Sequence, residues 1–205
     1  MDDFISINGI DYPSNLTKEE LAKYPFDHFK GKIYLFNDEE IEAEAIYKMY
    51  QSPVIGFDCE SKPSFKKGII NRVSLIQLAN ADMAVLIRIY SSRLPDEVIH
   101  LLESKKVFKA GIGITHDMTK LNPQNKIKPH SLIDLNVMAQ KAGFIGIGAR
   151  KLCAALLGFN INKSAQISNW EADILSKQQI QYAATDAWIC YEIYHKLALF
   201  PVKET

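Results

Sequence analysis

The sequence lacks an excess of charge of either sign. Its 205 residues include 24 Lys and Arg and 24 Asp and Glu, so the formal net charge at pH 7 is zero. Proteins that bind nucleic acid through a broad basic surface carry a clear positive excess. A polyanion would therefore have to be bound here at a local site, and metal ions are one way to supply positive charge locally.

Cysteine is scarce, and long apolar segments are missing. Cys59, Cys153 and Cys190 are odd in number and have no zinc-ligand spacing, so we expect buried free thiols. Segment 1–10 carries acidic residues and lacks the basic and apolar regions of a secretion signal. No apolar run approaches the length of a membrane span. We therefore expect a cytoplasmic protein without membrane partners.

Repeats and low-complexity segments are also absent, and the length suits one domain with a sizeable core. Residues 1–30 are predicted to form an irregular N-terminal extension, and residues 31–205 the functional domain. Within the extension, Thr17 followed by Glu20 has the pattern of a capping box, which predicts a short helix.

Apolar periodicity predicts the elements of the functional domain. Strands are expected at 32–36, 54–58, 72–78, 83–89, 107–112 and 131–135, and helices at 38–50, 94–102, 116–121, 136–142, 148–157 and 178–199. Pro123 and Pro201 are expected to end two of the helices, and Ser176 with Gln179 to cap the last one. Three antiparallel strands followed by parallel strands predict an α/β fold, a mixed sheet with helices on both faces.

Two acidic residues lie at the end of the predicted strand 54–58: Asp58 is its last residue, and Glu60 follows two positions later. Asp58 and Glu60 are two apart, so they share one face of an extended chain. Carboxylates this close repel, and one of them is neutralised unless a cation lies between them. The simpler interpretation makes Glu60 the first solvated loop residue, and for this common pair alone that interpretation is favoured.

The last predicted helix carries a tyrosine and an aspartate on one face. Tyr182 and Asp186 are four apart, and Ile189 and Ile193 share their face. Asp186 therefore lies in the stripe expected to pack on the sheet, where a carboxylate needs a partner or a metal ion. A structural Tyr–Asp hydrogen bond, or an ion pair with a lysine, explains this helix equally well.

A fourth acidic residue lies in the first turn of a predicted helix. Asp117 follows the segment 111–114, Gly-Ile-Gly-Ile, in the first turn of the helix after strand 107–112. The helix dipole favours a carboxylate there by about 0.3–1 kcal/mol, which is sufficient to explain Asp117 alone. The glycines allow close backbone approach, but the Gly-Lys-Ser/Thr ending of a phosphate loop is missing.

Taken together, these signals predict a metal centre. Asp58, Glu60, Asp117 and Asp186 would meet at one edge of the sheet. Hard divalent cations hold such a cluster together, and oxygen-only ligation suits Mg²⁺ or Mn²⁺. Two such ions about 3.5–4 Å apart can stabilise both the attacking and the leaving oxygen of a phosphoryl displacement.

The same segments resemble a known family. Residues 55–60 (Ile-Gly-Phe-Asp-Cys-Glu), 111–117 and 182–186 (Tyr-Ala-Ala-Thr-Asp) are similar to the three exonuclease motifs of the DEDD superfamily. Tyr182 places the chain in the DEDDy subgroup, because the histidine subgroup would have histidine where this chain has Gln181. Segments 72–78 and 168–170 (Ser-Asn-Trp) resemble Werner syndrome protein-type exonuclease domains. The resemblance covers about residues 30–200.

The resemblance implies a ribonuclease H-like fold and removal of nucleotides from the 3′ ends of nucleic acids, with DNA as the favoured substrate and RNA as the alternative. It implies that Asp58 bridges two metal ions, that Glu60 and Asp186 complete the tighter site, and that Asp117 reaches the second ion through water. Tyr182 would orient the attacking water.

Substrate contacts are expected at Cys59, His116 and Lys163. A solvated histidine and an ordinary surface lysine are the simpler interpretations of the last two. Trp170 could stack on a base, but we favour a structural role in which it anchors its loop to the core.

Two other functions fit the same segments. A catalytically inactive nucleic-acid-binding or scaffold module would be expected to have lost a carboxylate, and here all four carboxylates and the tyrosine are present. A two-metal endonuclease is disfavoured by the tyrosine motif, through the resemblance alone.

Overall fold

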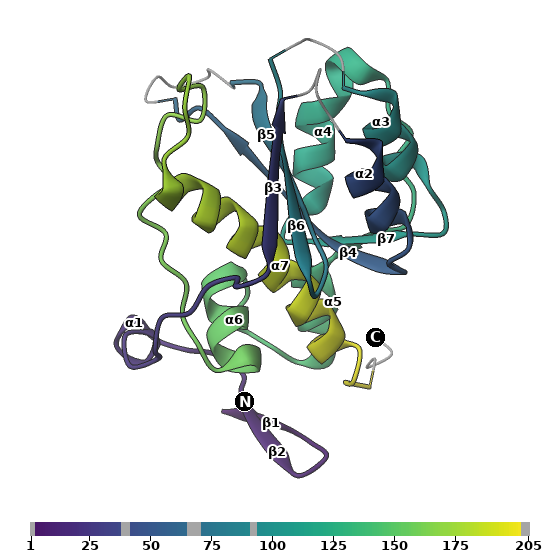
Figure 1. The fold of residues 1–205 in the computed structure, drawn as a ribbon. Coiled ribbons are helices and arrows are strands. Elements are labelled where there is room, and N and C mark those ends of the chain that lie inside the picture. Colours follow the sequence, from purple (N-terminus) through teal and green to yellow (C-terminus); the bar gives the residue numbers. More distant parts are fainter. Residues whose placement is uncertain (1–2, 38–41, 65–70, 91–93, 202–205) are drawn as a thin grey trace.

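A computed structural model describes residues 3–37, 42–64, 71–90 and 94–201 as a mixed sheet covered by helices (Figure 1). The strands of the sheet are β3 Lys32–Asn37, β4 Val54–Ser61, β5 Val73–Ala79, β6 Met83–Arg88, β7 Phe108–Gly111 and β8 Leu132–Asp134. The helices around it are α2 Ala43–Tyr50, α3 Asp96–Glu103, α4 Ile114–Asn125, α5 Leu135–Ala142, α6 Ala149–Leu157 and α7 Lys177–Leu197. Within these ranges no helix is long and apolar enough to span a bilayer.

The six strands are ordered β3-β6-β5-β4-β7-β8. β4, β5 and β6 form an antiparallel meander, and β7 and β8 continue the sheet parallel to β4. This arrangement confirms the mixed sheet expected from the sequence. β3 adds a parallel strand beside β6 at the opposite edge.

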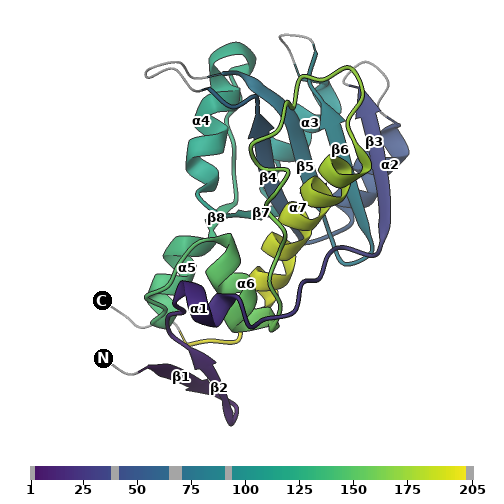
Figure 2. The ribbon, with the colours of Figure 1, turned by 90° about the vertical axis from the view of Figure 1, so that its left-hand side faces the viewer.

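Helices cover both faces of the sheet, as expected. α2, α3 and α4 pack on one face through a large apolar core, and α7 crosses the other face, with α5 and α6 packed around its second half (Figures 1 and 2). The central strands β5 and β6 are buried along their whole length, because helices lie above and below them. Ser176 and Gln179 form the predicted capping box at the start of α7.

The N-terminal segment differs from the prediction, because it is not irregular. Strands β1 Phe4–Ile7 and β2 Ile10–Pro13 form an antiparallel hairpin. Its turn is Asn8-Gly9, with φ of 50° and 76°, and Asn-Gly is the preferred sequence for a two-residue turn of this hand. The capping box of Thr17 and Glu20 is confirmed at α1 Lys18–Leu21. The domain boundary at residue 31 stays a prediction.

Two element boundaries were also predicted wrongly. α4 continues through Pro123 to Asn125. Proline removes one backbone hydrogen bond, and so near the end of the helix it does not stop the last turn. β4 continues past Asp58 to Ser61, because Glu60 still pairs with Leu75 of β5. The expected start of the second helix at residue 38 lies outside the described residues.

One glycine sets how closely α7 lies on the sheet. A Cβ atom built on Gly56 of β4 would come within 1.9 Å of the Ala187 carbonyl oxygen and 2.8 Å of the Tyr191 nitrogen. The missing side chain therefore lets the backbone of α7 touch β4. Asp186 is the residue before Ala187, so this contact also brings its carboxylate to the strand that carries Asp58.

Lys109 places an ammonium group in the core, where it bonds the loop between α3 and β7 to the end of α3. The residue is 0% exposed, and its Nζ donates to the carbonyl oxygens of Ser104 at 2.8 Å, Val107 at 2.9 Å and Leu101 at 3.4 Å. Burial lowers its pKa to about 8. The carbonyl groups match the three hydrogens of the charged form, which ties the loop to the end of the helix.

We predict that Lys109→Met lowers the free energy of unfolding by about 2–4 kcal/mol, because it leaves buried carbonyl groups without their donor. Urea denaturation measures the change. Lys106→Met, at an exposed position of the same loop, is the control and should change stability by less than about 0.5 kcal/mol. Equal effects of the two substitutions would show that Lys109 does not hold the loop.

Candidate active site

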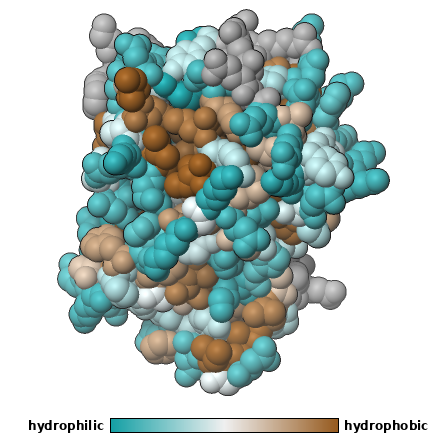
Figure 3. Space-filling model, in the orientation of Figure 1, coloured by the Kyte–Doolittle hydropathy of each residue, from teal (hydrophilic) through white to brown (hydrophobic). Residues whose placement is uncertain are grey.

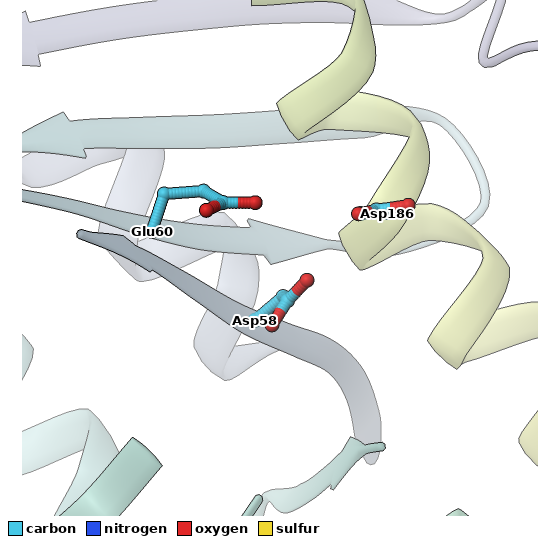
Figure 4. A group of neighbouring side chains, drawn as sticks. All are labelled: Asp58, Glu60 and Asp186. Carbon is cyan, nitrogen blue, oxygen red and sulfur yellow. The ribbon is translucent and has the colours of Figure 1, made fainter. Parts of the chain in front are cut away.

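Three carboxylates form an acidic cluster, Asp58, Glu60 and Asp186, where α7 crosses β4 (Figure 4). Asp58 and Glu60 are two residues apart on β4, so both side chains lie on the strand face that is turned toward α7. Asp186 comes from α7 itself. One oxygen of each carboxylate lies within 4.8 Å of the others. The sharing of one strand face by Asp58 and Glu60 is confirmed, and the interpretation of Glu60 as a loop residue is wrong because β4 includes it.

Burial and mutual repulsion disfavour the charged forms of these groups. The pKa of Asp58 is raised well above its ordinary value by burial and then by Asp186 and Asp117. Burial, followed by repulsion from Asp186, raises the pKa of Glu60 to about 8. Burial also raises the pKa of Asp186, and Lys163 and a hydrogen bond from Tyr182 oppose that rise. The acidic cluster therefore needs a proton or a cation.

The acidic cluster fits a divalent metal ion. Asp186 is 4% exposed, and its buried Oδ1 has no hydrogen-bond partner among the described residues. Leaving such an atom unpaired costs free energy. The donors are all carboxylate oxygens, the ligands that Mg²⁺ and Mn²⁺ prefer. These residues can hold such an ion, which would restore the missing partner.

The raised pKa values predict how pH changes the stability of the metal-free protein. Between pH 4.5, the ordinary pKa of this carboxyl group, and pH 8, the folded protein keeps a proton on Glu60 that the unfolded chain has released. Stability in EDTA should therefore fall as pH rises through this window. Urea denaturation at pH 5, 6.5 and 8 measures the slope.

Two controls accompany this pH series. Saturating Mn²⁺ should flatten the slope, because a cation stabilises the charged carboxylates. Glu60→Gln should make the slope in EDTA shallower, and the raised pKa values of Asp58 and Asp186 account for the part that remains. A slope in EDTA that is unchanged by Glu60→Gln would contradict the assignment of the lost stability to this carboxyl group.

Tyr182 lies beside the acidic cluster and is held by its surroundings. It is 6% exposed and forms side-chain hydrogen bonds with Asp186 and Glu60. Its ring centroid lies 6.0 Å from that of Trp170, which is 1% exposed and donates from Nε1 to the Gln166 carbonyl at 3.4 Å. The structural role favoured for Trp170 is confirmed, since it fixes both its loop and the tyrosine ring.

Asp117 lies at the edge of the site and outside the acidic cluster. It occupies the first turn of α4 and is 8% exposed. Its carboxylate pairs with Lys120 at 3.5 Å. Its charge nevertheless contributes to the raised pKa of Asp58. The structure therefore turns Asp117 toward the same site but does not bring it into contact distance of the other carboxylates.

The three expected substrate contacts lie in different surroundings. Lys163 is half-buried, and its charge lowers the pKa of both Glu60 and Asp186, so it faces the acidic cluster. His116 is exposed in the first turn of α4. Cys59 packs against the core on the opposite face of β4, while its N–H donates to Asp58 Oδ1 at 2.8 Å. Their contacts with substrate stay predictions.

Sequence reasoning missed Gln77. This residue of β5 pairs with Asp58 across the sheet and is 0% exposed. Neither its amide nitrogen nor its amide oxygen has a hydrogen-bond partner among the described residues. A large amide side chain inside a mostly apolar central strand was the available signal, since burying an unpaired polar group is costly.

The segment that leads into α7 exposes apolar surface. Ile167 is 70% exposed and Ile174 86% exposed. Figure 3 shows hydrophobic residues gathered in the upper left of this face, where Figure 1 draws this segment and the start of α7. Apolar surface beside a candidate site is typical of a binding surface.

The six-stranded mixed sheet and its flanking helices define a ribonuclease H-like α/β fold, with the acidic cluster where α7 crosses β4. A sequence model of a 3′-5′ exonuclease domain matches residues 33–199. The chain therefore belongs to the 3′-5′ exonuclease family and is an enzyme of the hydrolase class.

Relatives agree with this assignment. A 3′-5′ exonuclease of Arabidopsis thaliana is 33% identical, over 91% of this chain and 70% of its own length. The bifunctional 3′-5′ exonuclease/ATP-dependent helicase WRN of Mus musculus is 33% identical over 84% of this chain, which corresponds to 13% of that protein. The structure of Escherichia coli RNase D superposes with a TM-score of 0.69 at 21% identity, over 83% of this chain and 45% of that one.

Proposed function

We propose that this enzyme removes nucleotides from the 3′ ends of nucleic acids with two divalent ions, Mg²⁺ or Mn²⁺, with DNA as the favoured substrate and RNA as a possible one. The observation that carries the proposal is the acidic cluster with the unpartnered, buried Asp186 oxygen. Brucella melitensis NrnC, which has the same fold, has been solved with bound Mg²⁺ and also bound to pGG.

Each side chain of the site then has a distinct task. Asp58, Glu60 and Asp186 would hold the ions, with Asp117 at the edge of the site. Bound divalent ions supply Lewis-acid stabilisation of phosphoryl oxygens and lower the pKa of water. Lys163 faces the acidic cluster and offers a positive charge to the phosphate backbone. Tyr182 stays protonated, because burial and the neighbouring carboxylates raise its pKa far above the ordinary value.

A protonated Tyr182 can position a water molecule but cannot act as the base. We expect Tyr182→Phe to lower kcat by about 10- to 100-fold, because one hydrogen bond that orients the reacting water is lost. Mn²⁺ affinity, measured by calorimetry, should remain within about twofold, because the carboxylates are intact. Full activity of Tyr182→Phe would exclude the positioning role.

Two observations bear on whether the preferred substrate is DNA or RNA. Escherichia coli RNase D is an exoribonuclease, and our preference for DNA comes from the Werner-type motif resemblance. The zero net charge predicts few phosphate contacts and a shallow dependence of affinity on salt.

A substrate panel tests the proposed function and its alternative together. Single-stranded, duplex and recessed DNA and matching RNA are incubated with Mg²⁺, Mn²⁺ or EDTA. We expect faster degradation of DNA and none in EDTA. A catalytically inactive binding module would bind these substrates and degrade none of them, which would overturn the proposal. Faster degradation of RNA would overturn only the substrate preference.

A further inference from the structure

Gln77 lies on the face of the sheet that α7 covers, beside the acidic cluster. It is the Cα partner of Asp58 in the antiparallel ladder of β4 and β5. Residues directly opposite each other in such a ladder point to the same face, with Cβ atoms about 4.5–5.5 Å apart. The neighbours of Gln77 on that face, Leu75 and Ala79, pack against residues of α7. The Gln77 side chain therefore lies beneath α7 and next to that of Asp58.

The other surroundings of Gln77 are apolar or already engaged. On the side away from β4 it pairs with Leu86 of β6, which is 0% exposed. The diagonal polar residue on β6, Arg88, donates to two backbone carbonyl groups of the loop before α7. The part of α7 that packs on this region of the sheet presents small apolar residues, Ala183, Ala184 and Ala187. Asp58 is thus the polar side chain that the ladder places directly across from the amide.

The Gln77 amide is buried without a partner. The residue is 0% exposed, and neither Nε2 nor Oε1 has a hydrogen-bond partner among the described residues. Burying an unpaired amide costs free energy, whereas a methionine of similar size would fill the same space without that cost. Packing alone therefore does not account for a glutamine at this position.

The Asp58 carboxylate has room for a further donor. Its Oδ1 accepts from the Cys59 N–H at 2.8 Å, and a carboxylate offers about four acceptor positions on its two oxygens. The remaining positions can serve a metal ion and a second hydrogen bond. Carboxylates that bind metal ions are themselves held by hydrogen bonds from neighbouring groups, and these bonds fix their orientation. A neutral amide suits this task, because it brings no positive charge that would compete with the ion.

We propose that Gln77 is a positioning residue of the metal centre, whose amide Nε2 donates to the Asp58 carboxylate when a divalent ion is bound. This inference rests on the proposed function. With the ion in place Asp58 is charged, and a charged carboxylate is the stronger acceptor. The hydrogen bond gives Nε2 its missing partner and holds the plane of the carboxylate toward the ion. Gln77 thus acts through Asp58 and does not touch the substrate.

The test measures metal affinity and stability in a pair of variants. Gln77→Met keeps the approximate size of the side chain and removes the amide. We expect the Kd for Mn²⁺, measured by calorimetry, to rise by about 10- to 100-fold. The urea midpoint in EDTA should stay equal or rise, since an unpaired buried amide is removed. Leu78→Met is the control, because Leu78 is the next residue of β5 and belongs to the core on the opposite face; its Kd for Mn²⁺ should stay within about twofold of the wild-type value.

The possible results separate this inference from the proposed function. If the wild-type protein binds Mn²⁺ and Gln77→Met binds it equally well, the inference is overturned and the proposed function stands. If the wild-type protein binds no Mn²⁺, the metal centre and the proposed function fail, and the inference fails with them. If Gln77→Met lowers the urea midpoint or does not fold, a crystal structure of the wild-type protein with Mg²⁺ decides. Gln77 Nε2 within about 3.2 Å of an Asp58 carboxylate oxygen then supports the inference, and an amide bonded elsewhere overturns it.

Discussion

Asp58→Asn is expected to lower kcat by on the order of 10³-fold or more and at the same time to stabilise the metal-free protein. One carboxylate oxygen of Asp58 lies within 4.8 Å of oxygens of both Glu60 and Asp186, and a neutral amide cannot replace its charge toward a divalent ion. The same substitution removes repulsion in a half-buried group of like charges. Stability in EDTA at pH 8 should rise by about 1–2 kcal/mol.

Opposite effects on activity and stability distinguish a functional carboxylate from a structural one. Asp173→Asn, at an exposed position of the loop before α7, is the matched control and should change neither quantity. If Asp58→Asn lowers activity and stability together, its carboxylate supports the fold, and the assignment to the metal centre is wrong.

Gly56→Ala is expected to have the largest effect on the fold. The added Cβ would lie 1.9 Å from the Ala187 carbonyl oxygen, and the backbone of a long helix cannot give way as a flexible side chain can. We expect a loss of about 3 kcal/mol or more in the free energy of unfolding. The shift of α7 should also weaken Mn²⁺ binding by tenfold or more, because Asp186 moves away from β4.

Gly158→Ala is the control for this substitution. Gly158 has φ of 79° and no atom within 4 Å of an added Cβ, so the cost should be about 1–2 kcal/mol from backbone strain, with Mn²⁺ affinity unchanged. Unchanged Mn²⁺ affinity in a folded Gly56→Ala protein would show that the contact of α7 with β4 does not position Asp186.

The part of the site that local periodicity determines could be predicted from the sequence. Asp58 and Glu60 share a face because a strand alternates, and Tyr182 and Asp186 share a face because four residues make about one helical turn. The order of strands and helices also followed from local patterns. The N-terminal hairpin is the exception to the predicted elements, although its Asn8-Gly9 turn has the preferred sequence for a two-residue turn.

What the sequence could not show depends on contacts between distant segments. The distance of Asp117 from the acidic cluster depends on how α4 is placed against the sheet, whereas its pairing with Lys120 at 3.5 Å is local, because the two residues are three apart on the same helix. The approach of Phe29 to Thr185 joins residues 156 positions apart. No local pattern marks residues 26–28 as one wall of a pocket beside α7.

The direction of degradation tests the central claim most directly. A single-stranded DNA labelled at its 5′ end is incubated with the wild-type enzyme and Mg²⁺, and the products are resolved at single-nucleotide resolution over time. We predict a ladder of labelled fragments that shorten one nucleotide at a time from the 3′ end and that EDTA abolishes. Release of the label as a mononucleotide at the earliest times, or a few internal cuts without a ladder, would contradict the account.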